Sequence, residues 1–202
     1  MIYTPMIGKA IGFATEVHKT QKRKGKDVPY ITHPLAVAMI LARVGATEDQ
    51  IIAGILHDTI EDCVPYGSVT RELLEKEFNA QIAHMVSDLT EPAVVLEDSD
   101  SGEVNHDKKA TWLQRKIQAV AHIKHMSHES LLVKSADVLH NLCDLLADIG
   151  KDGDAAFASF NASKEDTIKR YQILIAEIQV HWPENPLRTD LEENVQKLIN
   201  VT

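Results

Sequence analysis

The sequence of 202 residues predicts an all-α protein, and three observations lead to this fold class. Apolar residues recur at three- and four-residue steps along nearly every segment, which is the period of a helix. Glycine and proline are sparse, at nine and seven residues. No segment shows the alternation or the turn dipeptides of a hairpin. We therefore expect one domain over residues 1–202, a helical bundle with a core at about 5–175 and C-terminal helices at about 162–202.

The first helices can be placed from their start and stop signals. One is expected from Pro5 to about His18, followed by a polar loop. Pro34 suits the first turn of the next helix because its missing N–H costs nothing there, and Gly45 stops that helix. Thr47 is a candidate N-cap for a third helix that continues to Cys63. The loop and these helices together hold most of the polar motifs discussed below.

The second half of the chain continues the helical pattern after one interruption. The segment from Glu91 to Asp107 is acidic and lacks periodicity, so we expect an exposed loop there. The helix after Glu129 should end at Gly150. The remaining helices are expected at Thr70–Phe78, Gln81–Leu89, Lys108–Lys124, Glu129–Ile149, Asp154–Phe160, Lys164–Trp182 and from Pro186 onward.

Composition argues against nucleic-acid and membrane partners. The formal charge of −9 argues against general nucleic-acid binding, which depends on clustered Lys and Arg. No run approaches the roughly 20 apolar residues of a membrane span, and the N-terminal stretch does not resemble a signal peptide. Cys63 and Cys143 lack CxxC spacing and are expected to be small buried thiols rather than a disulfide. We expect a cytoplasmic protein without membrane partners, and no feature indicates an oligomeric state.

A His and carboxylate cluster interrupts the apolar run of the third helix. If the helix continues, His57, Asp58, Glu61 and Asp62 project from one broad face that borders the core. Carboxylates buried together without compensation cost several kcal/mol. Mn²⁺, Fe²⁺, Zn²⁺ or Mg²⁺ would provide the compensation, while a solvated acidic helix end is the alternative.

Two other segments offer polar groups of the same kind. His33 precedes a helix start, from which its ring could project into a site between helices. Lys134, Asp137 and Asn141 share one face of an otherwise apolar helix. A polar stripe on such a helix indicates an internal ion pair or a ligand contact.

These motifs together resemble a known family. HPLAVA at His33, ILHDTIED around His57 and VKSADVLHNL around Asp137 are similar, in order and spacing, to the metal-dependent HD phosphohydrolases. Within that superfamily, HKTQKRKGKDVPYITHPLAVA resembles the hydrolase domain of RelA/SpoT-type proteins and of the small alarmone hydrolases. The resemblance covers roughly residues 5–175, the range of one domain. It implies a single-domain HD bundle that removes the 3′-pyrophosphate from guanosine tetra- or pentaphosphate.

The resemblance also implies a role for each matched residue. It implies a divalent metal, usually Mn²⁺, and Glu61 and Asp62 as the acidic pair that positions or deprotonates the attacking water. The implied metal ligands are His33, His57, Asp58 and Asp137. The implied substrate contacts are Arg23, Lys24, Arg115, Lys116, Lys134 and Asn141.

The sequence departs from the family at three positions and leaves other functions open. Ser135 and Val138 stand where the family often has Leu and Arg, and Cys143 stands where Arg is frequent. These departures concern substrate binding more than hydrolysis. A nucleotide phosphomonoesterase or another nucleotide pyrophosphohydrolase on the same scaffold is the first alternative. A catalytically silent nucleotide sensor is the second.

Overall fold

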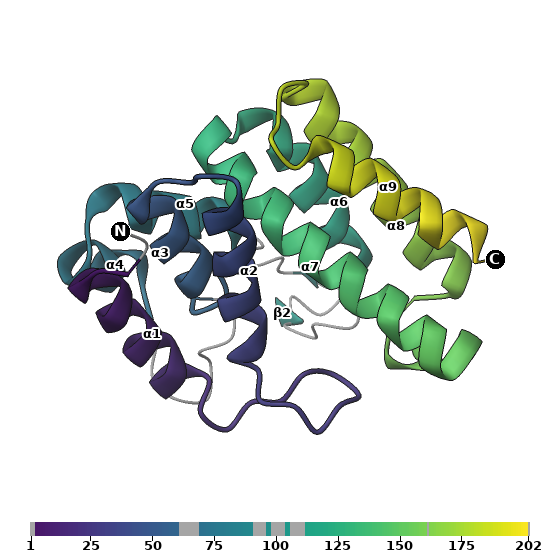
Figure 1. The fold of residues 1–202 in the computed structure, drawn as a ribbon, viewed down its shortest axis with the longest axis horizontal. Helices are drawn as coiled ribbons and strands as arrows, with labels where there is room; N and C mark the ends of the chain where they lie inside the picture. Colours follow the sequence, from purple (N-terminus) through teal and green to yellow (C-terminus); the bar gives the residue numbers. More distant parts are fainter. Residues whose placement is uncertain are drawn as a thin grey trace.

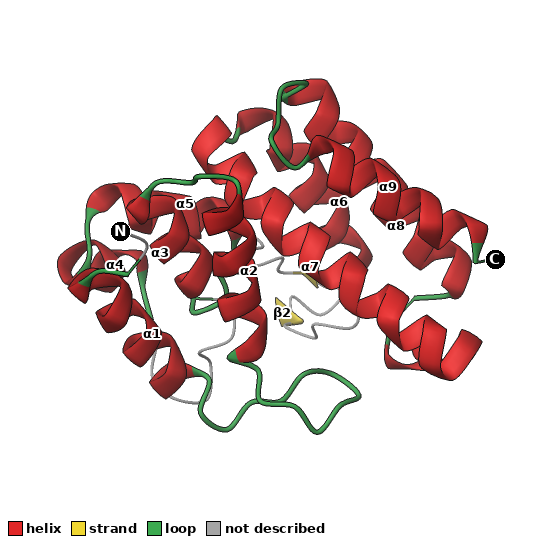
Figure 2. Cartoon of the chain, viewed as in Figure 1, coloured by secondary structure: helices red, strands yellow, loops and turns green. Residues whose placement is uncertain are grey.

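The computed structural model describes residues 3–60, 69–90, 96–97, 104–105, 112–160 and 162–201, and over this part of the chain the protein is helical (Figures 1 and 2). The expected all-α class is thereby confirmed. The α-helices are α1 (Pro5–Val17), α2 (Thr32–Arg43), α3 (Glu48–Leu56), α4 (Arg71–Glu77), α5 (Ala80–Leu89), α6 (Trp112–His122), α7 (His128–Asp152), α8 (Lys164–His181) and α9 (Arg188–Asn200). Two 3₁₀ helices, η1 (Ile123–His125) and η2 (Gly153–Ser159), follow α6 and α7.

Hydroxyl and amide side chains fix the starts of most helices. At Thr47 the side chain accepts from the backbone N–H of Gln50, whose own side chain accepts from the Thr47 N–H, so the expected N-cap of α3 is a complete capping box. The caps that accept a backbone N–H in the same way are Thr4, Thr70, Asn79, Ser127 and Ser163. Local sequence therefore sets where each of these helices begins.

Helix α7 is the centre of the molecule. Figure 1 shows this 25-residue helix running between α1 to α5 on one side and α8 and α9 on the other. It contacts α2, α3, α5, α8 and α9. Leu131 and Leu142 lie on its buried side within one continuous apolar core. The polar stripe of α7 is therefore held by packing on both flanks.

The connection between α8 and α9 is tied to α7 by buried polar groups. Asn185 donates to Ser135 Oγ at 2.7 Å, and Ser135 donates to the carbonyl oxygen of Leu131 at 2.7 Å. The Asn185 side-chain oxygen accepts from the Leu187 N–H at 2.9 Å. Ser135, one of the departures from the family pattern, therefore has a structural partner in this chain.

Three expectations were wrong: two concern where a helix ends, and one concerns a segment expected to lack secondary structure. Helix α3 ends at Leu56 instead of continuing to Cys63, and α7 passes through Gly150 and is capped by Gly153, whose φ of +59° suits glycine. The segment expected to be a structureless loop contains an antiparallel pair of two-residue strands, β1 (Leu96–Glu97) and β2 (Val104–Asn105).

Two further expectations concern the thiols and the membrane. Cys143 carries a free thiol but is exposed, contrary to the expected buried position, and Cys63 lies outside the described residues. Within the described part of the chain, no helix has the length and apolar character to cross a membrane.

Candidate active site

Four side chains from three segments meet where α2, α3 and α7 pack together. His33 lies in the first turn of α2, His57 caps the C-terminus of α3, Asp58 follows it, and Asp137 lies on α7. The Nε2 atoms of His33 and His57 are 3.1 Å apart. Asp58 Oδ2 lies 3.0 Å from His57 Nε2, and Asp137 Oδ1 lies 3.3 Å from His33 Nε2. The two rings and the carboxylates therefore converge on one point.

The end of α3 is bent into this arrangement by side chains that bond to the backbone. His57 Nδ1 lies 2.8 Å from the carbonyl oxygen of Gly54, and the Thr59 hydroxyl donates to the carbonyl oxygen of Leu56 at 2.7 Å. Such bonds compete with helix continuation. The Tyr30 hydroxyl donates to Asp58 Oδ2 at 2.6 Å, which fixes the carboxylate after the helix end.

The tautomers of the two histidines suit a cation. A carbonyl oxygen only accepts, so His57 Nδ1 carries hydrogen, and Nε2 presents a lone pair to the cluster whenever that atom is deprotonated. His33 Nδ1 lies 2.8 Å from His140 Nδ1. Burial and the nearby His33 and Arg23 lower the pKa of His140 to about 4, so that neutral ring can accept the His33 Nδ1 hydrogen. His33 Nε2 then also offers a lone pair.

The donor set fits a divalent metal. Although burial favours the neutral ring, Asp58 and Asp137 raise the pKa of His57 well above its usual value. Burial alone would raise the pKa of Asp137, yet the Lys134 ammonium and the two histidine rings hold it well below the usual range. The cluster therefore attracts positive charge, which a proton or a metal ion can supply. Ligand atoms of His33, His57 and Asp137 all lie within 4.8 Å of one another, a spacing that one ion could span.

A polar relay continues from Asp137 along α7. Asp137 Oδ2 accepts from Lys134 Nζ at 3.0 Å, and Oδ1 accepts from Asn141 Nδ2 at 2.6 Å. The Asn141 side-chain oxygen accepts from Arg23 Nη2 at 2.9 Å. Arg23 Nη2 also lies 2.9 Å from Asp144 Oδ2. The loop between α1 and α2 is thus joined to the part of α7 that carries Asp137.

Carboxylates of α7 hold the same loop further along. Lys26 Nζ lies 2.6 Å from Asp144 Oδ1 and 2.8 Å from Asp148 Oδ1. Burial would raise the pKa of Asp144, but its bonds to Lys26 and Arg23 lower it. We call Asp144 and Asp148 the acidic clamp.

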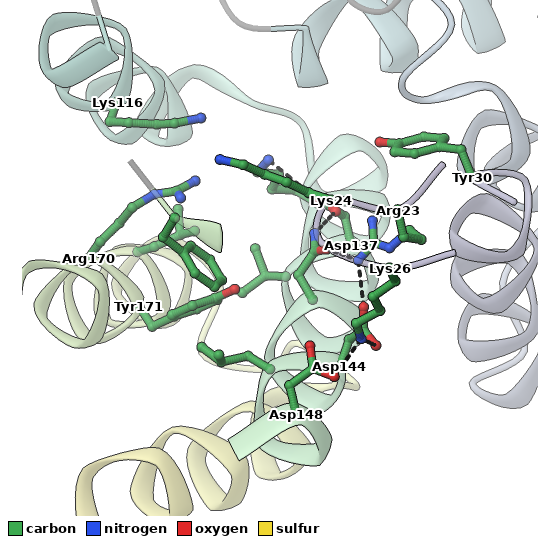
Figure 3. A pocket seen from close by; sticks show the side chains of 16 residues that line it. Arg23, Lys24, Lys26, Tyr30, Lys116, Asp137, Asp144, Asp148, Arg170 and Tyr171 are labelled. Carbon is green, nitrogen blue, oxygen red and sulfur yellow. Dashed lines mark hydrogen bonds and ion pairs between the residues drawn. The ribbon is translucent and has the colours of Figure 1, made fainter. Parts of the chain in front are cut away.

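A pocket of about 370 Å³ opens between this loop, α6, α7 and α8 (Figure 3). Its wall toward the cluster includes Asp137 and Tyr30, and its opposite side includes Lys116 of α6 and Arg170 of α8. The apolar part of its lining comprises Val138, Leu145, Phe160 and Leu174, with Tyr171 beside them. The pocket thus pairs an apolar surface with many charged groups, which suits an amphiphilic anionic ligand such as a nucleotide.

Most of the predicted site residues converge on the cluster and the pocket. The three side chains of the α7 stripe lie together as predicted, and Lys24 lines the pocket beside Arg23. Glu61 and Asp62 lie outside the described residues. Helix α3 ends at Leu56 with His57 as its cap, so His57 and Asp58 do not share a face of a continuing helix as expected. Arg115 belongs to α6, but its side chain is also outside the described part.

Sequence reasoning missed part of the lining. The acidic clamp continues the α7 stripe at helical steps, with Asp144 three residues after Asn141, so the period could have revealed it. Arg170 had no such signal, because α8 reaches the pocket only through tertiary packing. Tyr171 is buried and also lines the pocket.

The other departures from the family pattern fall in different places. Val138 lines the pocket, so the missing Arg affects the ligand surface directly. Cys143 is exposed near Arg43 of α2 and Asp190 of α9, which form an ion pair with each other at 2.7 Å. It is not among the residues that line the pocket.

Comparison with known families and sequences gives consistent matches. A family model described as HD domain matches residues 10–168. The guanosine-3′,5′-bis(diphosphate) 3′-pyrophosphohydrolase MESH1 of Danio rerio is 37% identical over 145 residues, which is 70% of each chain. The human MESH1 is 35% identical over 140 residues, covering 68% of each chain.

Longer relatives and solved structures match as well. A GTP pyrophosphokinase of Myxococcus xanthus is 30% identical over 93% of this chain, which corresponds to 22% of its own length. A solved structure of a metazoan ortholog of SpoT, described as hydrolysing ppGpp, covers 96% of both chains with a TM-score of 0.72 at 21% identity. The structure of lmo0812 from Listeria monocytogenes covers 83% of this chain and 99% of its own, with a TM-score of 0.67 at 22% identity. The two structures share the helical fold described above.

Proposed function

The chain belongs to the HD-domain family, and from this premise we propose that it is a metal-dependent hydrolase that releases pyrophosphate from the 3′ position of guanosine 3′,5′-bis(diphosphate), ppGpp. The observation that carries the proposal is the convergence of His33, His57, Asp58 and Asp137 at one end of a cation-lined pocket. Relatives named for this reaction are 35–37% identical over more than two thirds of the chain.

The four side chains of the cluster would hold the ion, which we propose is Mn²⁺. A bound divalent ion lowers the pKa of a coordinated water and polarises a phosphoryl oxygen. The Gly54 carbonyl and His140 orient the two histidine rings, and Tyr30 orients Asp58. These contacts fix the ligands before substrate arrives.

The other polar and charged side chains would neutralise charge on the reacting phosphoryl group, bind the nucleotide and accept the proton of the attacking water. Lys134 lies beside Asp137 and would neutralise charge that develops on the cleaved phosphoryl group. Arg23, Lys24, Lys116, Arg115 and Asn141 would contact the nucleotide phosphates and base. Glu61 and Asp62 would take the proton of the attacking water, and as a close pair they would share the titration.

Product analysis tests this function. Metal-stripped protein would be incubated with ppGpp and Mn²⁺, and separately with a panel of nucleoside monophosphates, with chromatographic resolution of the products. We expect GDP and pyrophosphate, lost in Asp58→Ala and retained in Asp152→Ala, an exposed carboxylate at the end of α7. Orthophosphate from the monophosphates would support a phosphomonoesterase instead, and silence on every substrate would support a nucleotide sensor.

The proposed acid pair has its own test. Glu61→Ala/Asp62→Ala should abolish turnover while Mn²⁺ content, measured by elemental analysis, stays unchanged. A parallel loss of bound Mn²⁺ would contradict the proposed role and would make the pair part of the metal site.

A further inference from the structure

Arg170 is a half-buried guanidinium in the pocket wall that has no assigned partner. It lies on α8 directly before the buried Tyr171, and both residues line the pocket. Among the residues that the structure describes, none forms a hydrogen bond or an ion pair with the Arg170 side chain. A guanidinium has five donors in a planar fork that matches a phosphate or a carboxylate. The pocket therefore contains a forked donor whose anion is not supplied by the described protein.

Other cations of the pocket are already engaged. Arg23 and Lys26 are paired with the acidic clamp, and Lys134 is paired with Asp137. An incoming phosphate would have to compete with a carboxylate at each of these three cations. At Arg170 it would meet no such competition from the described residues.

The position of Arg170 separates it from the metal-ligand cluster. Figure 3 shows Arg170 and Lys116 on one side of the pocket and Asp137 on the other, with the end of Lys24 turned toward Lys116. The pocket lining also includes apolar side chains, which weaken the screening of charges in the pocket. A ligand that places one phosphate group at the cluster would therefore need a second anionic group to pair with Arg170.

Tyr171 keeps this side of the pocket free of added negative charge. The hydroxyl is protonated at neutral pH, as any tyrosine with the usual pKa near 10 would be, and burial raises its pKa further, to about 12. The neighbouring Arg170 therefore acts on a ligand without an anionic tyrosine beside it.

We propose that Arg170 is a specificity-determining residue that binds the phosphate group that is not cleaved, at the end of the substrate opposite the metal. This inference rests on the proposed function, whose substrate ppGpp carries phosphate groups at both the 3′ and the 5′ positions, and it adds the residue that recognises such doubly phosphorylated substrates. Such substrates would be preferred over those that carry only the reacting 3′-diphosphate.

The test compares three substrates that differ only at the 5′ end. They are guanosine 3′-diphosphate with a 5′-diphosphate, with a 5′-monophosphate and with a free 5′-hydroxyl. Arg170→Gln should raise KM for the first by on the order of 10- to 100-fold, the loss of one charge-assisted contact. KM for the 5′-hydroxyl substrate and kcat for all three should change less than about threefold, since Arg170 does not touch the reacting atoms. Arg170→Lys should restore part of the preference because it keeps the charge.

The matched control is Lys169→Gln, which removes the same charge from the adjacent exposed residue outside the pocket lining. It should leave the ratio of KM values among the three substrates unchanged. An equal loss by Arg170→Gln on all three substrates, or no loss on any, would overturn the assignment.

A binding measurement separates this inference from the proposed function. If the wild type cleaves none of the three substrates, the function fails, and pyrophosphate titration of the metal-stripped protein by calorimetry then decides for Arg170. Weaker binding in Arg170→Gln but not in Lys169→Gln supports the anion site. Equal affinity in the wild type and both variants refutes it.

Discussion

The acidic clamp gives a quantitative prediction, because one carboxylate holds two cations of the loop between α1 and α2. Asp144 bonds to Arg23 at 2.9 Å and to Lys26 at 2.6 Å. The side chains are 28%, 15% and 25% exposed, respectively, so the pairs are only partly screened. Asp144→Asn keeps the shape and one acceptor oxygen but removes the charge. The variant therefore isolates the ionic part of the contact.

The expected cost lies between two known limits. Exposed ion pairs contribute about 0.2–1 kcal/mol, and hydrogen bonds to charged groups about 1.5–3 kcal/mol. Because the asparagine side chain of the variant would still accept from one cation, we expect a loss of about 1–2 kcal/mol in the free energy of unfolding. For a protein of this size, that loss lowers Tm by roughly 2–8 °C.

Urea denaturation with hydrogen exchange of the 22–29 loop would measure both effects. The matched control is Asp27→Asn, an exposed carboxylate of the same loop that pairs with Lys22, and it should cost less than about 0.5 kcal/mol. We also expect faster exchange of the loop in Asp144→Asn alone. A change below about 0.3 kcal/mol with unchanged exchange would refute the clamp, since it is within the usual scatter of independent sites.

The acid limb of the stability curve provides a second check on Asp144. Its pKa is lower in the folded protein than in the unfolded chain, so its stabilisation is present above the unfolded value, near pH 3.9. That contribution is lost as the pH falls through the folded pKa. The gap between wild type and Asp144→Asn should therefore narrow below about pH 4.

Three other predictions concern buried groups. Tyr171 has a pKa of about 12 in the folded protein, whereas an unfolded tyrosine titrates near pH 10. Between these two pH values the free energy of unfolding should therefore fall by about 2–3 kcal/mol more in the wild type than in Tyr171→Phe, as measured by denaturation at each pH. Gly54→Ala would place the new Cβ 2.5 Å from Leu41 Cδ1, between α3 and α2. The free energy of unfolding should therefore fall by about 1–3 kcal/mol in a denaturation experiment, and an unchanged midpoint would contradict this close approach. Asn185→Ala leaves Ser135 Oγ without its donor and should lower the free energy of unfolding by about 1–3 kcal/mol. An unchanged Tm in a calorimetric scan would show that the hydrogen bond between α7 and the α8–α9 connection does not stabilise the fold.

Most of the fold could be predicted from the hydrophobic periodicity of the helices and from their N-cap residues. The residues that begin helices act through bonds to the next turn, so Thr47 and Thr70 could be placed from sequence. The end of α3 could not be placed in this way, because it depends on His57 and Thr59 bonding back to the chain within a packed site. Gly150 was misjudged for a related reason: a glycine stops a helix only where the backbone turns, and the turn occurs at Gly153.

In the candidate site, too, residues placed by local helix spacing could be predicted, whereas those placed by tertiary packing could not. Lys134, Asp137 and Asn141 were predictable because one helix spaces them, and the position of His33 followed from its motif. Arg170 was not predictable, because its place in the pocket depends on how α8 packs beside α7.

Helix α7 also determines which changes of length the chain can tolerate. Positions from Lys134 to Asp148 span about 21 Å of one rigid rod, in which each residue advances about 1.5 Å and turns about 100°. One inserted residue between Asp137 and Asp144 would leave the cluster aligned but rotate Asp144 away from Arg23. Insertions and deletions are therefore expected to be tolerated between the helices and excluded from this stretch of α7, even where individual side chains can be exchanged.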